Sequence, residues 1–173
     1  MFSPMPPKPP GFEPADHLIV DAVGTVAERS FFAFVDVCDD PAAYDDGREW
    51  LVATVRFEDG PVAGRLECTL RSDLAQVLFD AFSGRHPASP LPPAHELDDL
   101  VGEFSNMICG TWLTRCASDR AFRLSRPEVV HLRRPAEDEH HRHWVCLNSR
   151  PLAVDWEVEH RPGVVVSNSW FQA

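Results

Sequence analysis

Residues 95–115 read HELDDLVGEFSNMICGTWLTR and contain the longest helical pattern in the chain. On an α-helix, which advances by about 100° per residue, the apolar side chains of this stretch fall on one stripe. The stripe consists of Leu97, Leu100, Phe104, Met107 and Ile108. Such a stripe is typical of a helix that buries one side against a core. The sequence therefore predicts an amphipathic helix from about Ala94 to Ala117.

A strip of polar residues with one glycine lies at the edge of this apolar stripe. Glu103, Asn106 and Gly110 fall within about 60° of one another around the helix, and Asp99 lies on the same strip. A carboxylate and a carboxamide one turn apart therefore project together. A glycine one turn further along lets the backbone of another molecule approach closely. By itself, this spacing is also that of an ordinary solvated helix face.

An amide beside a carboxylate suits phosphoryl chemistry. Hydrolysis of an acyl phosphate requires a water held in line with the phosphorus and little covalent help from the protein. The amide of Asn106 can orient such a water by hydrogen bonding without a tuned pKa. The carboxylate of Glu103 can pair with a lysine of a partner and so fix the docking geometry.

The rest of the chain predicts an α+β fold. Residues 17–37 have helical spacing, although their Val and Phe content leaves a strand open for the second half. Residues 50–57 and 62–70 flank a turn with Asp-Gly-Pro and predict an antiparallel hairpin. Residues 72–83 predict a short helix with a glycine after its end, and the C-terminal part predicts short strands. We expect an antiparallel sheet with helices packed on one face.

Length and charge narrow the class of protein. The 173 residues suffice for one domain, which we place at residues 15–173, after a disordered proline-rich lead-in at residues 1–14. A formal net charge of −11 argues against binding to nucleic acid or to an anionic membrane surface. With neither a signal-peptide pattern nor an apolar run long enough to cross a membrane, we expect a cytoplasmic protein.

The cysteines and histidines raise the possibility of disulfides, a metal site or a covalent nucleophile. The five cysteines are scattered and form no Cys-x-x-Cys pair, so they predict neither a disulfide framework nor a zinc ribbon. The stretch EHHRH at residues 139–143 could supply imidazoles to a metal-dependent hydrolase, but a polar turn before a strand explains it better. Covalent catalysis lacks support, because Cys109 is expected to point away from Glu103 and Asn106 and no Gly-x-Ser-x-Gly is present.

The string GEFSNMICG at residues 102–110 resembles the signature helix of the CheX/CheC/FliY phosphatases. That helix carries Glu, then Asn after two residues, then Gly after three more. The predicted elements over residues 17–132 are also similar in order to those of the family. The resemblance implies that Asn106 positions the attacking water on a phosphorylated CheY-like receiver domain and that Glu103 forms a salt bridge with the receiver's lysine. Gly110 and Asp99 would contact the partner.

The resemblance carries further expectations. It implies no cofactor of the protein's own, because the receiver supplies Mg²⁺, and it makes a homodimer through sheet edges plausible. A second Glu-x-x-Asn in the first helix, as in CheC, is missing, because Phe31 follows Glu28 at the Asn position. This favours the single-site CheX type. A non-catalytic receiver-binding or scaffolding module of the same fold is the alternative, and the target receiver stays open.

Overall fold

A computed structural model describes Phe12, residues 14–36, Cys38 and residues 46–86, 88–133 and 142–161. In chain order the elements are α1 (Asp16–Phe31), β1 (Val35–Asp36), β2 (Trp50–Asp59), β3 (Val62–Arg71), α2 (Ser72–Ser83), α3 (Ala94–Cys116), β4 (Arg123–Leu124), β5 (Glu128–Leu132), β6 (His143–Leu147) and β7 (Arg150–His160). Most of the predicted proline-rich lead-in, most of the EHHRH stretch and a predicted strand near residues 164–170 lie outside the described residues.

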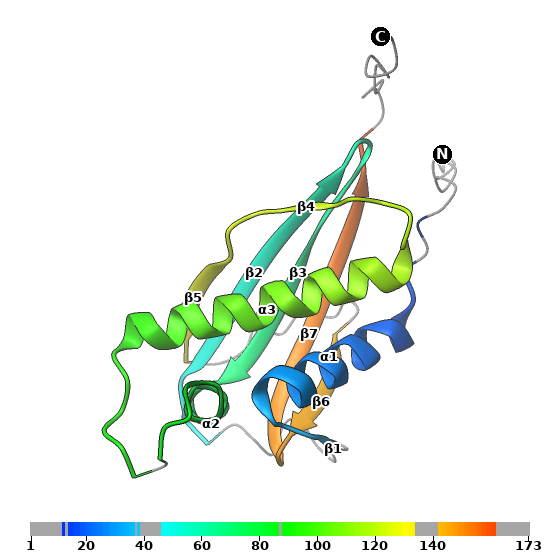
Figure 1. The fold of residues 1–173 in the computed structure, drawn as a ribbon. Helices are drawn as coiled ribbons and strands as arrows, with labels where there is room; N and C mark the ends of the chain where they lie inside the picture. The colour runs from blue at the N-terminus through cyan, green and yellow to red at the C-terminus, as the bar shows by residue number, and fades with distance from the viewer. Residues whose placement is uncertain are drawn as a thin grey trace, which may run out of the picture.

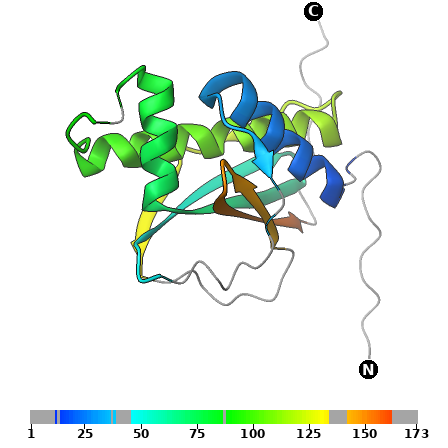
Figure 2. The same ribbon diagram turned by 90° about the horizontal axis from the view of Figure 1, so that it is seen from below.

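All the described strands form one antiparallel sheet in the order β1-β6-β7-β3-β2-β4, and β5 also pairs with β2. The three helices lie on a single face of this sheet (Figures 1 and 2). The α+β fold with helices on one face, predicted from the sequence, is therefore confirmed.

The hairpin of β2 and β3 lies in the interior of the sheet, and the predicted antiparallel pairing is confirmed. Pairing runs without a break from Asp59↔Val62 to Trp50↔Arg71. Alternate β2 side chains enter the core under the helices, namely Leu51, Ala53, Val55 and Phe57. Because side chains alternate along a strand, Arg56 and Glu58 lie on the face without helices, where both are exposed.

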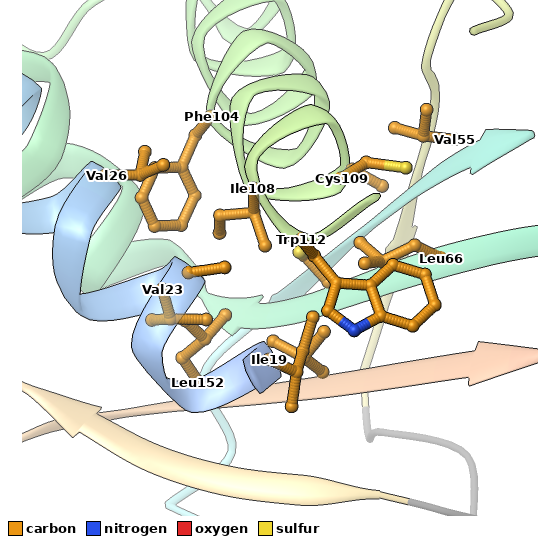
Figure 3. Packing of buried hydrophobic residues seen from close by; sticks show 14 of the residues in the cluster. Ile19, Val23, Val26, Val55, Leu66, Phe104, Ile108, Cys109, Trp112 and Leu152 are labelled. Atoms are coloured by element: carbon orange, nitrogen blue, oxygen red, sulfur yellow. The ribbon is translucent and has the colours of Figure 1, made fainter. Parts of the chain in front are cut away.

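Helix α3 lies across the sheet beside α1, and the core fills the space between them (Figure 3). Its buried arc is wider than the predicted stripe, because α3 packs against the sheet as well as α1. The additional buried residues are Val101, Gly102, Ser105, Cys109, Trp112 and Leu113. Leu97 and Met107, which the stripe included, are only partly buried.

Helix α1 ends at Phe31, earlier than the helical pattern of residues 17–37 suggested. Phe32 adopts a left-handed conformation with φ 51°, which stops the helix, and its backbone N–H donates to the Ala27 oxygen. The chain then turns into β1 at Val35. The strand left open for the second half of this segment therefore exists, but it is only 2 residues long.

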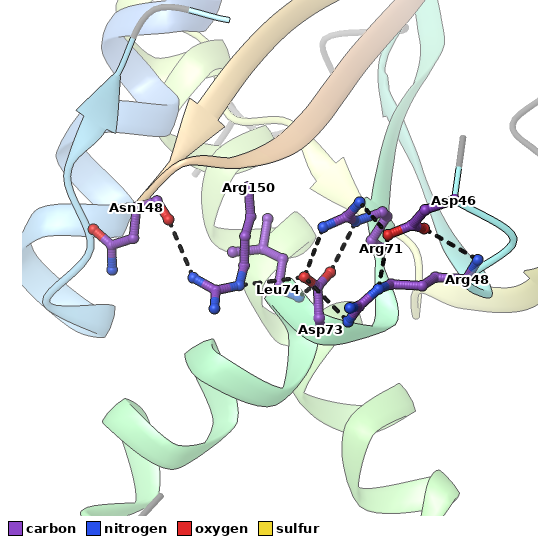
Figure 4. Close-up of polar contacts among 7 residues, drawn as sticks. All are labelled: Asp46, Arg48, Arg71, Asp73, Leu74, Asn148 and Arg150. Carbon is purple, nitrogen blue, oxygen red and sulfur yellow. Dashed lines mark hydrogen bonds and ion pairs between the residues drawn. The ribbon is translucent and has the colours of Figure 1, made fainter. Parts of the chain in front are cut away.

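A network of arginines and aspartates fixes the start of α2 at the end of β3 (Figure 4). The buried guanidinium of Arg71 donates to both carboxylate oxygens of Asp73, with Nε···Oδ1 2.9 Å and Nη2···Oδ2 2.7 Å. Arg150 approaches the same carboxylate, with Nε 3.4 Å from Oδ2. A buried charge is tolerated only when it is paired, and Asp73 in the first turn of α2 supplies the partner of Arg71 at the end of β3.

The structure contains a disulfide, which the scattered cysteines did not predict. Cys38 and Cys146 are bonded across 108 residues of sequence, with their Cα atoms 5.2 Å apart. Strand β1 pairs with β6 in a register that sets Asp36 opposite Cys146, which brings Cys38 into reach. The spacing of cysteines along the chain contains no trace of this pairing, because it depends on which strands are neighbours. The other three cysteines are free.

Candidate functional site

The four predicted site residues share the outward side of α3. Asp99 and Glu103 are exposed, whereas Asn106 and Gly110 are half-buried. On one flank of this strip runs the segment that contains β4 and leads to β5, which contributes Leu124 near Gly110. The strip of Asp99, Glu103, Asn106 and Gly110, called the α3 strip below, is thus an accessible polar surface on a rigid helix.

Asn106 has an unusual environment for an amide. Its Oδ1 is buried from solvent, yet it finds no hydrogen-bond partner among the described residues. Leaving a buried polar atom unpaired costs about 1–3 kcal/mol, and such an atom calls for an explanation, for example a catalytic role or a bound water or ion. Other side-chain atoms among the described residues are in the same condition, and the amide oxygen of Gln76 is one of them. The assignment of oxygen and nitrogen within an amide rests on its hydrogen bonds, and the half-buried side chain must rotate to present its shielded end to a ligand.

Gly110 and Gly102 lie on the same helix but in different surroundings. A Cβ added at Gly110 would meet only Leu124 Cδ1, at 3.8 Å, which is an ordinary contact. A Cβ added at Gly102 would lie 3.2 Å from Pro127 Cβ, which is tight. The packing of the isolated chain therefore gives a reason for glycine at position 102 and none at position 110.

Glu103 presents a carboxylate that forms no ion pair with any described residue, on the outward side of the helix. A free carboxylate at the surface can pair with a cation of a partner at no cost to an existing salt bridge. Glu103 and Asn106 are three residues apart, so their side chains are neighbours on the helix surface. Together they form an acceptor-rich site without a nucleophile.

No family model matches the sequence, and neither does any curated protein. Solved structures do match in fold. The chemotaxis protein CheX from Vibrio vulnificus superposes with a TM-score of 0.62 at 17% identity, over 83% of this chain and 95% of that one. CheX from Borrelia burgdorferi, solved as a CheX-CheY-BeF₃-Mg²⁺ complex, gives 0.55 at 13% identity over 83% and 97%. FliY from Thermotoga maritima gives 0.51 at 14% identity over 82% and 84%.

The chain has the CheX/CheC/FliY fold. These matches cover 82–83% of the chain. The fold suggested by the string GEFSNMICG is therefore confirmed. At 13–17% identity the comparison establishes the fold alone, and the roles of the residues on the α3 strip rest on their geometry.

A histidine clamp beside α3 was not predicted from the sequence. His131 of β5 lies between two carboxylates, with Nε2 2.7 Å from Asp98 Oδ1 and Nδ1 3.1 Å from Glu49 Oε2. Partial burial lowers the pKa of His131, but the hydrogen bonds and charges of Asp98 and Glu49 outweigh that effect and raise it. The clamp ties the N-terminal half of α3 to β5 and to the start of β2. The sequence does not indicate this clamp, because the pairing of β5 with β2 is what brings His131 close to Glu49.

The other chemistries considered from the sequence find no support in this CheX-like fold. Cys109 is buried in the core, and burial raises the pKa of its thiol, so it is a poor nucleophile. Burial likewise raises the pKa of Cys68 to about 12. His140 and His141 lie outside the described residues, and His143 lies beside Asp16, with Nε2 3.4 Å from Oδ1.

Two absences hold for the part of the chain that the structure describes. Within those residues, no three His, Cys, Asp or Glu side chains are placed to hold a metal ion. None of the helices described is both long and apolar enough to cross a membrane.

Proposed function

We propose that this protein is a phosphatase of the single-site CheX type, which removes the phosphoryl group from the aspartate of a CheY-like receiver domain. One observation carries the proposal. The outward side of α3, in a CheX/CheC/FliY fold, presents an Asn106 amide whose buried oxygen has no partner among the described residues. A ligand that supplies the missing hydrogen bond is one explanation of such an atom, and the position of Asn106 beside Glu103 on the outward side of α3 favours it.

The reaction asks little of the phosphatase beyond geometry. The Asn106 amide holds a water in line with the phosphorus of the receiver's aspartyl phosphate. Attack of the water oxygen forms a new P–O bond while the bond between phosphorus and the aspartyl oxygen breaks. The receiver's aspartate leaves as a carboxylate, and inorganic phosphate forms. The water's proton passes to a phosphoryl oxygen or to solvent, because an amide cannot accept it at neutral pH.

The remaining residues of the α3 strip orient the two proteins. The Glu103 carboxylate forms a salt bridge with a lysine of the receiver, and Asp99 one turn before it extends the acidic surface. Gly110 lets the receiver's backbone come close to the helix. The receiver brings the Mg²⁺ that neutralises the phosphoryl oxygens, so this chain needs no cofactor of its own.

Partner and location follow from the same proposal. The Borrelia burgdorferi structure holds a CheX together with CheY, BeF₃ and Mg²⁺, which supports a receiver domain as the partner here. Receivers act in the cytoplasm, so we place this protein there. A homodimer through sheet edges is part of the proposal, and sedimentation velocity would detect it as a species of twice the 19.4 kDa chain mass.

The test is phosphate release from a panel of phosphorylated receivers with Mg²⁺ present. We expect the wild-type protein to accelerate release from at least one receiver, Asn106→Ala to abolish the acceleration and Glu103→Gln to raise the receiver concentration needed. Binding to an activated receiver without faster release would instead establish the scaffolding module. Neither binding nor release with any receiver would contradict both.

A further inference from the structure

The face of the sheet that bears no helix has a cleft of about 450 Å³. It lies at the end of the β2–β3 hairpin, where β2, β3, β4 and β7 contribute its lining. Helix α3, which carries the α3 strip, covers the opposite face of the sheet (Figure 2). Any ligand of this cleft is therefore separate from the proposed receiver site. A volume of this size is within the range of small-molecule sites, about 300–1,000 Å³.

The cleft is hollow because a small residue lies between long ones. In the sheet register, Ala63 of β3 lies between Glu58 of β2 and Glu159 of β7. The alanine side chain is too short to fill the space that its charged neighbours enclose. Gly64, next along β3, has no room for a Cβ, which would meet the Glu157 carbonyl oxygen and the Phe57 ring. Because that Cβ would point toward Phe57 on the helix-covered face, Gly64 contributes only its backbone to the cleft.

Two arginines face each other across the floor. Arg56 of β2 and Arg65 of β3 are directly paired residues, and both side chains are on the face without helices. Arg65 is neutralised, with Nη1 2.8 Å from Glu67 Oε2 and Nε 3.0 Å from Glu157 Oε2. Like charges directly opposite each other destabilise a sheet, and Arg56 has no ion pair with any of the residues described.

A second unpaired guanidinium lines the same cleft. Arg161, just after β7, also forms no ion pair within the described part of the chain. The fourth arginine, Arg123, approaches Glu58 with Nη2 3.5 Å from Oε1. The Glu159 carboxylate is unpaired among the described residues as well. Two free guanidiniums beside one free carboxylate are notable in a chain with a net charge of −11.

We propose that this cleft binds a small phosphate monoester. A phosphate monoester carries a charge of about −1.5 to −2 at neutral pH, which matches the two guanidiniums of Arg56 and Arg161. The guanidinium fork suits phosphate oxygens because it donates two parallel hydrogen bonds. Glu159 accepts a hydrogen bond from a hydroxyl or amino group of the organic part. A nucleoside monophosphate and a sugar phosphate share this chemistry.

The experiment is calorimetric titration of the full chain with AMP and with glucose 6-phosphate, using adenosine and glucose as uncharged counterparts. We expect one site per chain for at least one of the phosphates and none for its uncharged counterpart. Arg56→Gln and Arg161→Gln should each weaken binding by about tenfold or more. Arg29→Gln, which removes the same charge from α1 on the other side of the sheet, should not change it. The tighter of the two phosphates identifies the class of ligand.

Two results would overturn the proposal. One is the lack of binding by either phosphate, and the other is an equal loss of affinity in Arg29→Gln, which would show only diffuse attraction to charge. Because Arg56 is exposed and opposite a like charge, Arg56→Gln should unfold at the same temperature as the wild type or higher. The cleft variants should dephosphorylate a receiver at the wild-type rate, so the two proposals fail separately.

Discussion

Asn106 combines two properties that together fit a role in docking a partner. It lies on the accessible side of α3, and its Oδ1 is nevertheless shielded from solvent without a partner among the described residues. Asn is also a weak helix former, so the position sacrifices stability in two ways. A role that appears only when a receiver docks would explain both costs.

Asn106→Ala is therefore expected to leave the free energy of unfolding unchanged or to raise it by up to about 1 kcal/mol. The substitution removes the unpaired oxygen and introduces the best helix former. Urea denaturation followed by circular dichroism measures the change. As a control, Phe104→Ala two residues away should cost about 3–5 kcal/mol, because Phe104 is fully buried. A comparable loss in Asn106→Ala would make Asn106 a structural residue.

Gly110→Ala should stabilise the isolated chain by about 0.5–1 kcal/mol, because the new methyl group meets only an ordinary contact and glycine disfavours a helix interior. The same substitution should weaken receiver binding, since it closes the path for the partner's backbone. Thermal denaturation and calorimetric titration with a receiver measure the two effects. Gly102→Ala is the matched control, and there the contact with Pro127 should cancel or reverse the gain. Destabilisation by Gly110→Ala would disprove the assignment.

At the scale of the elements, the orientation of α3 depends on the clamp of His131 with Asp98 and Glu49. The imidazolium is favoured in the folded state, because the two carboxylates raise the pKa of His131 above its unfolded value of about 6.5. Its stabilisation is thus fully present below pH 6.5 and is lost as the pH rises through the folded pKa.

We therefore expect the wild-type free energy of unfolding to fall with rising pH above about 6.5. His131→Asn should be less stable than the wild type at pH 6 and should lose this dependence. Urea denaturation at pH 6, 7 and 8 measures both. His17→Asn serves as the control, because His17 of α1 is exposed and forms no ion pair with any described residue. An equal slope in wild type and His131→Asn would show that the clamp contributes nothing.

An element can be predicted from the sequence when residues close to its ends determine where it begins and ends. The β2–β3 hairpin and α2 were predicted because turn residues and glycine mark their ends, as at Gly60 and Gly84, both with positive φ. The early end of α1 depends on the left-handed conformation of Phe32, and no glycine or other typical turn residue at this position indicates it in the sequence. The wide buried arc of α3 depends on packing against two layers, which a single helical stripe cannot show.

Long-range pairing limited the prediction of the site in the same way. The α3 strip could be predicted, because Glu103, Asn106 and Gly110 belong to one helix and helix geometry brings them together. The His131 clamp and the cleft at Arg56 combine residues from three or more separate segments of the chain. Their assembly requires the strand order and register, which composition and periodicity do not contain.

For the whole molecule, the disulfide between Cys38 and Cys146 closes the largest described loop. A reducing agent should lower the free energy of unfolding by about 2–4 kcal/mol, because opening this loop of 108 residues frees the unfolded chain. Urea denaturation with and without dithiothreitol measures the loss. Cys38→Ser should show the same loss of stability and no further response to the reductant. Cys116 is a free cysteine, so Cys116→Ser should still lose stability when the reductant is added.

That measurement also bears on the proposed location. A reducing cytoplasm would open the bridge, so the reduced protein is the form that a cytoplasmic receiver would meet. If reduction leaves stability unchanged, the bridge does not form in the protein, and the pairing of Cys38 with Cys146 is wrong.

The most direct test of the central claim is single-turnover dephosphorylation of a responsive receiver at saturating phosphatase, comparing the wild type with Asn106→Ala. If Asn106 positions the attacking water, the rate constant at saturation falls by about 100-fold in Asn106→Ala, the cost of losing a positioned reactant, while the affinity for the activated receiver stays within about twofold. An Asn106→Ala protein that binds the receiver and dephosphorylates it at the wild-type rate would contradict the account.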